Sequence, residues 1–264
     1  MNSNQLLSSR VEREKVAHDE RDVLGENRRL RSKFAHVDCY PSRVRLLAEI
    51  AKHVSNLKQK TVLDYGCGLG IDIVRYLNAG AAKVCGIDIS EKYIEQAKAQ
   101  CLVNGYCPDQ YDLRVMDAHN LEYEANSFDY VIGRGILHHL DVKVALRSLH
   151  RVLKPGGRML FAEPLADNPL LKLFRLLTPH ARTEDERPFT RRQIADLVLP
   201  SLWESEISYC GIFEAPVSMA TSILMPSKLD NWFLRAADKI EVSFNRLQIL
   251  SSWNQVILFN LVKK

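Results

Sequence analysis

The chain has 264 residues, of which 46% are hydrophobic and 26% charged. These fractions are ordinary for a folded globular protein and exclude collagen-like, coiled-coil and disordered classes. The net charge of +4, from 36 basic and 32 acidic side chains, is too balanced to indicate nucleic-acid binding. No apolar stretch approaches the ~18 residues of a membrane span, and the first residues lack the order of a secretory signal. We therefore expect a cytoplasmic protein.

The cysteines show no CxxC pair and no other spacing typical of metal ligands. Several of them stand in apolar runs, which favours reduced, buried thiols over disulfides. We accordingly expect no metal site. The six are Cys39, Cys67, Cys85, Cys101, Cys107 and Cys210.

The N-terminal residues differ in character from the rest of the chain. Residues 1–40 are rich in charges of both signs and poor in periodic apolar positions, so we predict a helical arm or lid. Residues 41–264 form the main domain. We divide it into a first part, residues 60–163, and later elements at 164–250. It begins with an amphipathic helix over 42–57.

A regular alternation of strands and helices follows. Ser90 and Asp141 are placed to cap two of the helices, and the PGG at 155–157 predicts a turn before a strand. The alternation predicts a parallel sheet with helices on both faces. The predicted strands are 61–66, 83–90, 111–116, 128–133 and 158–163, and the helices 71–80, 91–105 and 141–153.

The regular alternation of strands and helices ends after residue 163. An apolar and basic helix is predicted at 168–180, a helix with a capping box of Thr190 and Gln193 ends near Pro200, and another helix covers 228–248. Strands are predicted at 203–210 and 253–262. The fold class is thus α/β: a doubly wound, mostly parallel seven-stranded sheet, with an N-terminal helical arm and helical insertions in the C-terminal part.

The most informative segment is Asp64-Tyr65-Gly66-Cys67-Gly68-Leu69-Gly70, between a strand and a helix. Glycines there permit positive φ and a close approach of a ligand to the backbone. The pattern differs from the G-x-G-x-x-G of dehydrogenases by the preceding acid. Because a carboxylate repels a pyrophosphate and attracts an amine or a cation, Asp64 favours a ligand without phosphates.

Two further acids end the next strands. Asp88 suits the hydroxyls of a ribose, and Asp117 suits the amine of an adenine. Either acid could instead cap a helix, and the glycines could be plain turn residues. Together, a glycine loop and two acids on three successive strand ends describe an adenosyl ligand.

These segments resemble the class I S-adenosyl-L-methionine-dependent methyltransferases. The resemblance covers residues 60–163 and implies that Gly66, Gly68 and Gly70, after Asp64, lie near the methionine part of S-adenosyl-L-methionine. It also implies that Asp88 with Ile89 binds the ribose, that Asp117 with Ala118 holds the adenine, and that the 134–136 loop borders the sulfonium. The matching segments are VLDYGCGLG, GIDIS, MDAHNL, SFDYVIGRGILHHLD and LKPGGRML.

Arg134 departs from the family, in which a small or amide residue is usual. It either contacts the carboxylate of the cofactor or an acidic substrate, or faces solvent. An acceptor hydroxyl or ammonium also needs a base. The candidates are His138 and His139, which are often only structural in related families, then Glu163, and His18 if the arm closes.

The residues after the fourth strand narrow the acceptor. Gly133-Arg134-Gly135-Ile136 lacks the [DNS]-P-P-[YFW] pattern of DNA amino-methylating enzymes, so we expect no nucleic-acid partner. Residues 212–248, with Met219, Met225, Trp232 and Phe233, are expected to roof the acceptor site, and the helix at 168–180 either packs there or touches a membrane surface weakly.

We therefore expect methyl transfer to a small, hydrophobic or aromatic acceptor, on oxygen or carbon. The oligomeric state stays open. One alternative is a catalytically inactive cofactor-binding subunit with a regulatory or scaffold role. Another is a nicotinamide-dependent oxidoreductase.

Overall fold

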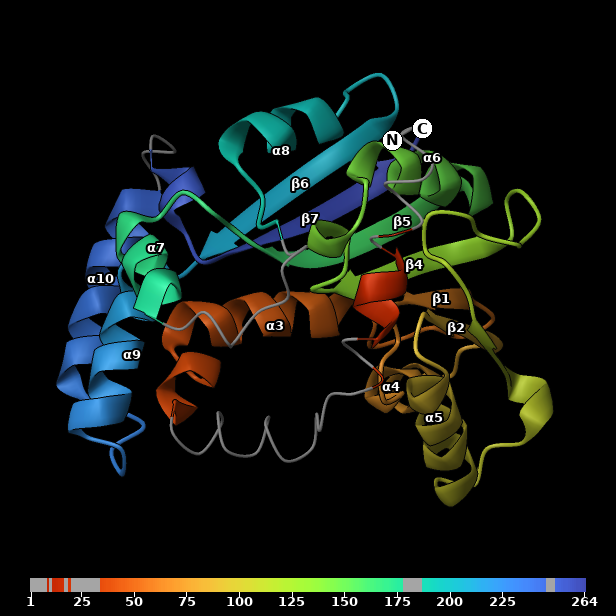
Figure 1. The fold of residues 1–264 in the computed structure, drawn as a ribbon, viewed down its shortest axis with the longest axis horizontal. Helices are drawn as coiled ribbons and strands as arrows, with labels where there is room; N and C mark the ends of the chain where they lie inside the picture. Colours follow the sequence, from red (N-terminus) through yellow and green to blue (C-terminus); the bar gives the residue numbers. More distant parts are fainter. Residues whose placement is uncertain (1–8, 10, 17–18, 20–33, 178–186, 246–249) are drawn as a thin grey trace.

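A computed structural model describes residues 9, 11–16, 19, 34–177, 187–245 and 250–264. Its centre is a seven-stranded sheet in the order β3-β2-β1-β4-β5-β7-β6 (Figure 1). β7 runs antiparallel to both of its neighbours, and all other pairs are parallel. The predicted fold class is confirmed. The strands are β1 (Thr61–Tyr65), β2 (Lys83–Asp88), β3 (Tyr111–Val115), β4 (Phe128–Arg134), β5 (Leu153–Pro164), β6 (Trp203–Cys210) and β7 (Val256–Lys263).

Helices cover both faces of the sheet (Figure 1). On one face α4 and α5 bury apolar side chains together with Val62, Ile132 and Leu160, and on the other α6 and α8 pack over Leu63, Val131 and other alternate strand residues. This alternation is what a sheet buried on both sides requires. The helices are α3 (Pro41–His53), α4 (Ile71–Asn78), α5 (Glu91–Val103), α6 (Val142–Val152), α7 (Pro169–Leu177), α8 (Arg191–Leu197), α9 (Glu214–Leu224) and α10 (Trp232–Asn245).

The predicted helix caps are confirmed. The Ser90 side chain accepts a hydrogen bond from the Tyr93 amide at 3.2 Å. Asp141 accepts from the amides of Lys143 and Val144, and Thr190 forms a capping box with Gln193. Such caps satisfy amide groups that have no partner within the helix.

Three local predictions are wrong. The segment PGG at 155–157 was predicted as a turn before a strand, but it lies inside β5. The pairing of β5 with β4 is irregular there, because its register shifts between Phe128 and Tyr130 of β4. α9 was not predicted, because its sequence EAPVSMATSIL is rich in small and hydroxyl residues without a clear apolar stripe. α10 begins at Trp232 instead of 228, because Asn231 caps it by accepting from the Leu234 amide at 3.1 Å.

A third apolar cluster joins the C-terminal helices to α3. It includes Leu46 of α3, Leu171 of α7, Ala215 of α9 and Leu234 of α10. α7 therefore packs on the body through Leu171, although Leu170 and Leu176 are exposed; residues 178–180 of the predicted helix lie outside the described part. Within the described residues, no helix is long and apolar enough to cross a membrane.

The connections place a site at one edge of the sheet. β1 leads to β2 on one side, whereas β4 lies on the other side of β1. In sheets of this kind ligands bind beyond the carboxyl ends of the strands, where the strand order reverses. The loops after β1, β2, β3 and β4 meet there.

Candidate functional site

The loop after β1 is held against the end of β2. The amides of Gly66 and Cys67 donate to the Ile87 carbonyl at 3.0 and 2.8 Å. Gly66 and Gly68 have φ of +78° and +49°, in the left-handed region that favours glycine. A side chain added at Gly68 would meet no atom within 4 Å. The loop thus presents its backbone to open space.

Asp88 fastens this loop to the start of α5. Its Oδ2 accepts from the Gly68 amide at 2.9 Å, and its Oδ1 accepts from the Ser90 amide at 3.0 Å. Because Ser90 is the residue that caps α5, Asp88 is not the helix cap. A carboxylate offers about four acceptor positions, so it can bind backbone amides and hydroxyl donors of a ligand at the same time.

Asp117 is oriented by His119. Asp117 Oδ1 accepts from the His119 amide at 2.9 Å and lies 2.7 Å from His119 Nδ1. Nε2 of the same ring accepts from the Asp141 amide at 2.9 Å, which places the proton on Nδ1. Although burial raises the pKa of Asp117, the His119 hydrogen bonds keep that pKa below its usual value. Asp117 is thus held as a carboxylate at the end of β3.

These groups line one cavity, called here the strand-end cavity. The described part of the N-terminal arm also lines it, through Val11 and Glu14. His18, the predicted base in the arm, lies outside the described residues. The predicted site residues in this cavity are Gly66, Gly68, Asp88, Ile89, Asp117, Ala118, Arg134 and His139.

Asp64 and Gly70 do not line the strand-end cavity. A side chain at Gly70 would lie 2.7 Å from Ala97 Cβ, so Gly70 permits close packing of α4 on α5. Asp64 is buried, and its Oδ2 has no hydrogen-bond partner among the described residues. Burial, with a contribution from Asp72, raises the pKa of Asp64 well above its usual value, and Arg134 opposes this rise.

Arg134 stands at the end of β4. Its guanidinium pairs with Asp72 in the first turn of α4. It therefore sits beside the glycine loop and is not a purely solvent-facing residue. Arg134 and the following Gly135 also line a second cavity, so the two cavities are neighbours.

The second cavity, called here the side cavity, holds about 380 Å³. It lies between α3, the loop after β4, and the ends of β5, β6 and β7. Residues 212–248, which were expected to roof the acceptor site, contribute no residue to the described lining of this cavity, whereas α3 does. Its lining includes Arg43, Leu46, Leu47, His138, Ala162, Glu163, Cys210, Gln255 and Val256.

His138 and Glu163 form a buried pair in the wall of the side cavity. His138 Nδ1 lies 2.8 Å from Glu163 Oε2, while Glu163 Oε1 accepts from the amides of Ile136 and Leu137 at 3.0 and 2.9 Å. Glu163 is fully buried and His138 is 6% exposed. The carboxylate favours a proton on Nδ1, so Nε2 carries the lone pair of the neutral ring.

His139 turns the other way. It lines the strand-end cavity, and its Nδ1 lies 3.3 Å from Glu14 Oε1 of the arm. The rings of His138 and His139 remain in contact, with centroids 4.1 Å apart. The two neighbouring histidines thus face different cavities.

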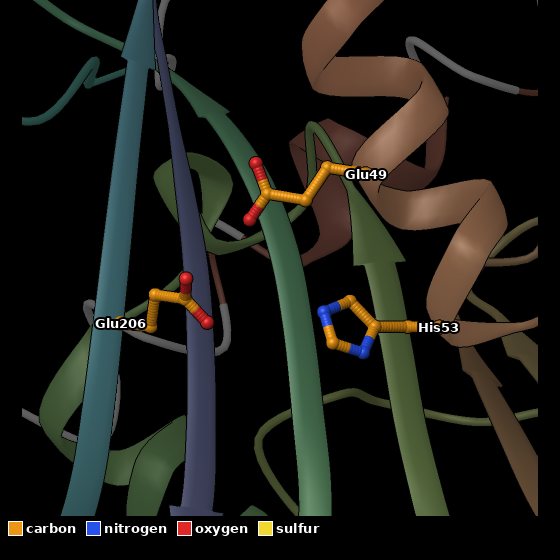
Figure 2. Close-up of side chains that lie close together, drawn as sticks. All are labelled: Glu49, His53 and Glu206. Atoms are coloured by element: carbon orange, nitrogen blue, oxygen red, sulfur yellow. The ribbon is translucent and has the colours of Figure 1, made fainter.

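A cluster of possible metal ligands lies apart from both cavities. Figure 2 shows Glu49 and His53 of α3 pointing toward Glu206 of β6. The amide nitrogen of Asn260 already donates to His53 Nε2 at 3.2 Å and to Glu206 Oε2 at 3.0 Å. Because this amide group occupies the ligand atoms, we assign no metal here.

Several residues in the two cavities were not singled out from the sequence. His119 stands two positions after Asp117 in the sequence, but its contact with the Asp141 amide depends on the fold. Arg43 and Gln255 stand far from the motifs in sequence and reach the side cavity only through the packing of α3 and the entry of β7.

Residues 63–161 match a family model described as "Methyltransferase domain". The chain is 32% identical over 127 residues to O-methyltransferase cnsE of Penicillium expansum, covering 47% of this chain and 45% of the relative. It is 35% identical over 117 residues to a ubiquinone biosynthesis O-methyltransferase of Neisseria meningitidis serogroup C, covering 44% and 48%. The chain thus spans about half the length of the curated relatives it matches.

The fold is shared with solved structures of low sequence identity. A geranyl diphosphate C-methyltransferase of Streptomyces coelicolor A3(2) aligns with a TM-score of 0.61 and 12% identity, over 84% of this chain and 78% of that one. At this identity the likeness concerns the fold alone.

Proposed function

Residues 63–161 of this chain belong to the methyltransferase domain family, and from that premise we propose that the protein transfers a methyl group from S-adenosyl-L-methionine to a small acceptor. The single observation that carries the proposal is the strand-end cavity, in which an open glycine loop, Asp88 and Asp117 meet and whose described lining holds no lysine or arginine cradle for phosphates. Arg134, the one guanidinium in its described lining, is paired with Asp72.

The residues present fit this cofactor. The open space at Gly68 would admit the methionine part, and Asp88, in the cavity lining, would accept hydrogen bonds from the ribose hydroxyls. Asp117 and Ala118 border the adenine end, with the carboxylate fixed by His119. Arg134 also lines this cavity, with its guanidinium paired to Asp72.

The side cavity is the proposed acceptor site, because it adjoins the strand-end cavity at Arg134 and Gly135. S-adenosyl-L-methionine, when bound, supplies an electrophilic methyl group. His138 would accept the proton of an acceptor hydroxyl at Nε2, while Glu163 holds Nδ1 and stabilises the resulting imidazolium. This pair favours oxygen over carbon as the methylated atom, as in the names of the two curated relatives.

The described part of the N-terminal arm lines the strand-end cavity through Val11 and Glu14. Glu14 contacts His139, and Asp19 accepts a hydrogen bond from Ser90 at 2.5 Å. These contacts tie the arm to the loops after β4 and β2. We propose that residues 1–40 act as a lid, which would align the reactants and exclude water.

Calorimetric titration with S-adenosylhomocysteine, and separately with NAD and NADP, tests the proposal. We expect S-adenosylhomocysteine to bind and the two nicotinamide cofactors not to bind. Binding of a nicotinamide cofactor alone would support the oxidoreductase alternative and overturn the proposal. Tight S-adenosylhomocysteine binding with no turnover over a broad panel of acceptors would instead support the inactive subunit.

A further inference from the structure

Arg43 carries a charge that the walls of the side cavity leave poorly compensated. Its Nε is buried and has no hydrogen-bond partner among the described residues. Among the described residues, the acid that pairs with Arg43 is Asp38, 3.4 Å from the guanidinium and 49% exposed. A long ion pair with an exposed acid is weak. A buried N–H without a partner costs free energy unless a ligand supplies an acceptor.

The other ionic groups of this cavity already have partners. Both oxygens of Glu163 accept hydrogen bonds from the 136–138 backbone or from His138. The Arg134 guanidinium pairs with Asp72. Among the ionic groups of the described lining, Arg43 is therefore the one held only by a long ion pair.

A second donor belongs to Gln255, which also lines this cavity. Gln255 uses its amide oxygen to accept from the Tyr40 hydroxyl at 2.6 Å. Its amide nitrogen makes no hydrogen bond to any residue that the structure describes. Gln255 and Arg43 both line the cavity, so its described lining holds two side chains with a donor that lacks an acceptor among the described residues.

The remaining lining is largely apolar, with Leu46, Leu47, Ala162 and Val256. In such surroundings a charge-assisted hydrogen bond is stronger than in water. The fork of a guanidinium also matches the two oxygens of a carboxylate or a phosphate. The occupant that satisfies this cavity has an anionic group at Arg43 and an apolar body.

We infer that the methyl acceptor is an anion, a carboxylate or phosphate compound with an apolar body, and that Arg43 binds its charged group. This inference rests on the proposed function, because it assigns the side cavity to the acceptor. Arg43 is then a specificity-determining residue: it anchors one end of the acceptor and leaves the hydroxyl at the other end beside His138. It plays no part in the strand-end cavity.

Three small probes of similar shape test the inference by NMR titration of the full chain saturated with S-adenosylhomocysteine: benzoate, phenyl phosphate and benzamide. We expect at least one of the two anions to bind about 10-fold or more tightly than benzamide. The stronger anion identifies carboxylate or phosphate as the recognised group. Arg43→Gln should abolish this preference, and Arg43→Lys, which keeps the charge, should retain part of it.

The matched control is Lys52→Gln, which removes the same charge from an exposed position of the same helix outside the cavity. It should keep the anion preference, and circular dichroism confirms the fold of each variant. Equal binding of benzamide and the anions, binding of none of the three, or a preference that survives Arg43→Gln would overturn the inference. Failure of wild-type protein to bind S-adenosylhomocysteine would overturn the proposed function instead, so the two failures are distinguishable.

Discussion

Asp88 is the residue on which the geometry of the glycine loop depends most directly. It accepts from the amides of Gly68 and Ser90 and would also receive the ribose hydroxyls. We expect Asp88→Ala to weaken S-adenosylhomocysteine binding by about 1–3 kcal/mol, because charge-assisted hydrogen bonds are lost. Calorimetry measures this. Asp112→Ala, which removes an acid paired with Arg114 on β3 away from the cavity, is the control. Unchanged affinity in Asp88→Ala would refute the ribose role.

His138 and His139 are separable by substitution because they face different cavities. We expect His138→Ala to lower the methyl-transfer rate by roughly 10²- to 10⁴-fold, the usual worth of a general base, with S-adenosylhomocysteine affinity unchanged. His139→Ala should retain most of the rate. Single-turnover kinetics with a hydroxyl acceptor and calorimetry supply the two readouts. If the two variants and the wild type transfer at one rate, neither histidine is the base.

Individual site residues were predictable where a motif marks a strand end. Asp88, Asp117 and the glycines follow short apolar runs, so their meeting at one edge followed from a parallel sheet. The pairing of His138 with Glu163 was not predictable, because the two lie 25 positions apart and meet only through the alignment of β4 and β5. Arg43 carried no signal at all, since nothing in the sequence places α3 beside the ends of β5 and β7.

At the scale of elements, close packing of α4 on α5 depends on Gly70. An added side chain would lie 2.7 Å from Ala97 Cβ and 2.8 Å from its Cα, and φ is +77°. Gly105 is a matched control, with φ of +81° and no atom within 4 Å of an added side chain. We expect Gly105→Ala to cost about 1–2 kcal/mol from backbone strain, and Gly70→Ala to cost about 1–3 kcal/mol more from overpacking.

Urea unfolding of the two variants measures the difference. An equal loss in the free energy of unfolding for both variants would mean that α4 and α5 adjust to the added methyl group without cost. The same elements illustrate what sequence patterns convey: caps and strand-to-helix turns were predictable because their chemistry is local. The irregularity at 155–157 and helix α9 were not, because both depend on pairing or packing with distant segments.

At the scale of the whole molecule, a buried pair of acids joins α3 to the C-terminal helices. The Ser42 hydroxyl lies within hydrogen-bond distance of both Glu214 and Glu241, and Glu241 accepts from the amides of Gly211 and Phe213. Burial raises the pKa of Glu214 to about 7, against the Ser42 hydrogen bonds and with a contribution from Glu241. The fold thus holds a proton that the unfolded chain releases.

This proton makes folding stability depend on pH. The pKa of Glu214 rises from 4.5 in the unfolded chain to about 7 in the fold, so its contribution is fully present below pH 4.5 and is lost as the pH rises to 7. We expect Glu214→Gln to remove this contribution to the change of the free energy of unfolding with pH. The control Glu204→Gln, at an exposed position of β6, should keep it. Urea unfolding between pH 5 and 8 measures both. The same slope in wild type and Glu214→Gln would show that Glu214 is ionised throughout.

The docking of an adenosyl compound at the ends of β1, β2 and β3 is tested most directly by a crystal structure of the protein with S-adenosylhomocysteine. We expect its ribose hydroxyls within hydrogen-bond distance of Asp88, its adenine beside Asp117 and Ala118, and its sulfur facing the side cavity past Gly135. The ligand bound elsewhere, or its absence from a strand-end cavity closed by protein side chains at saturating concentration, would contradict the account.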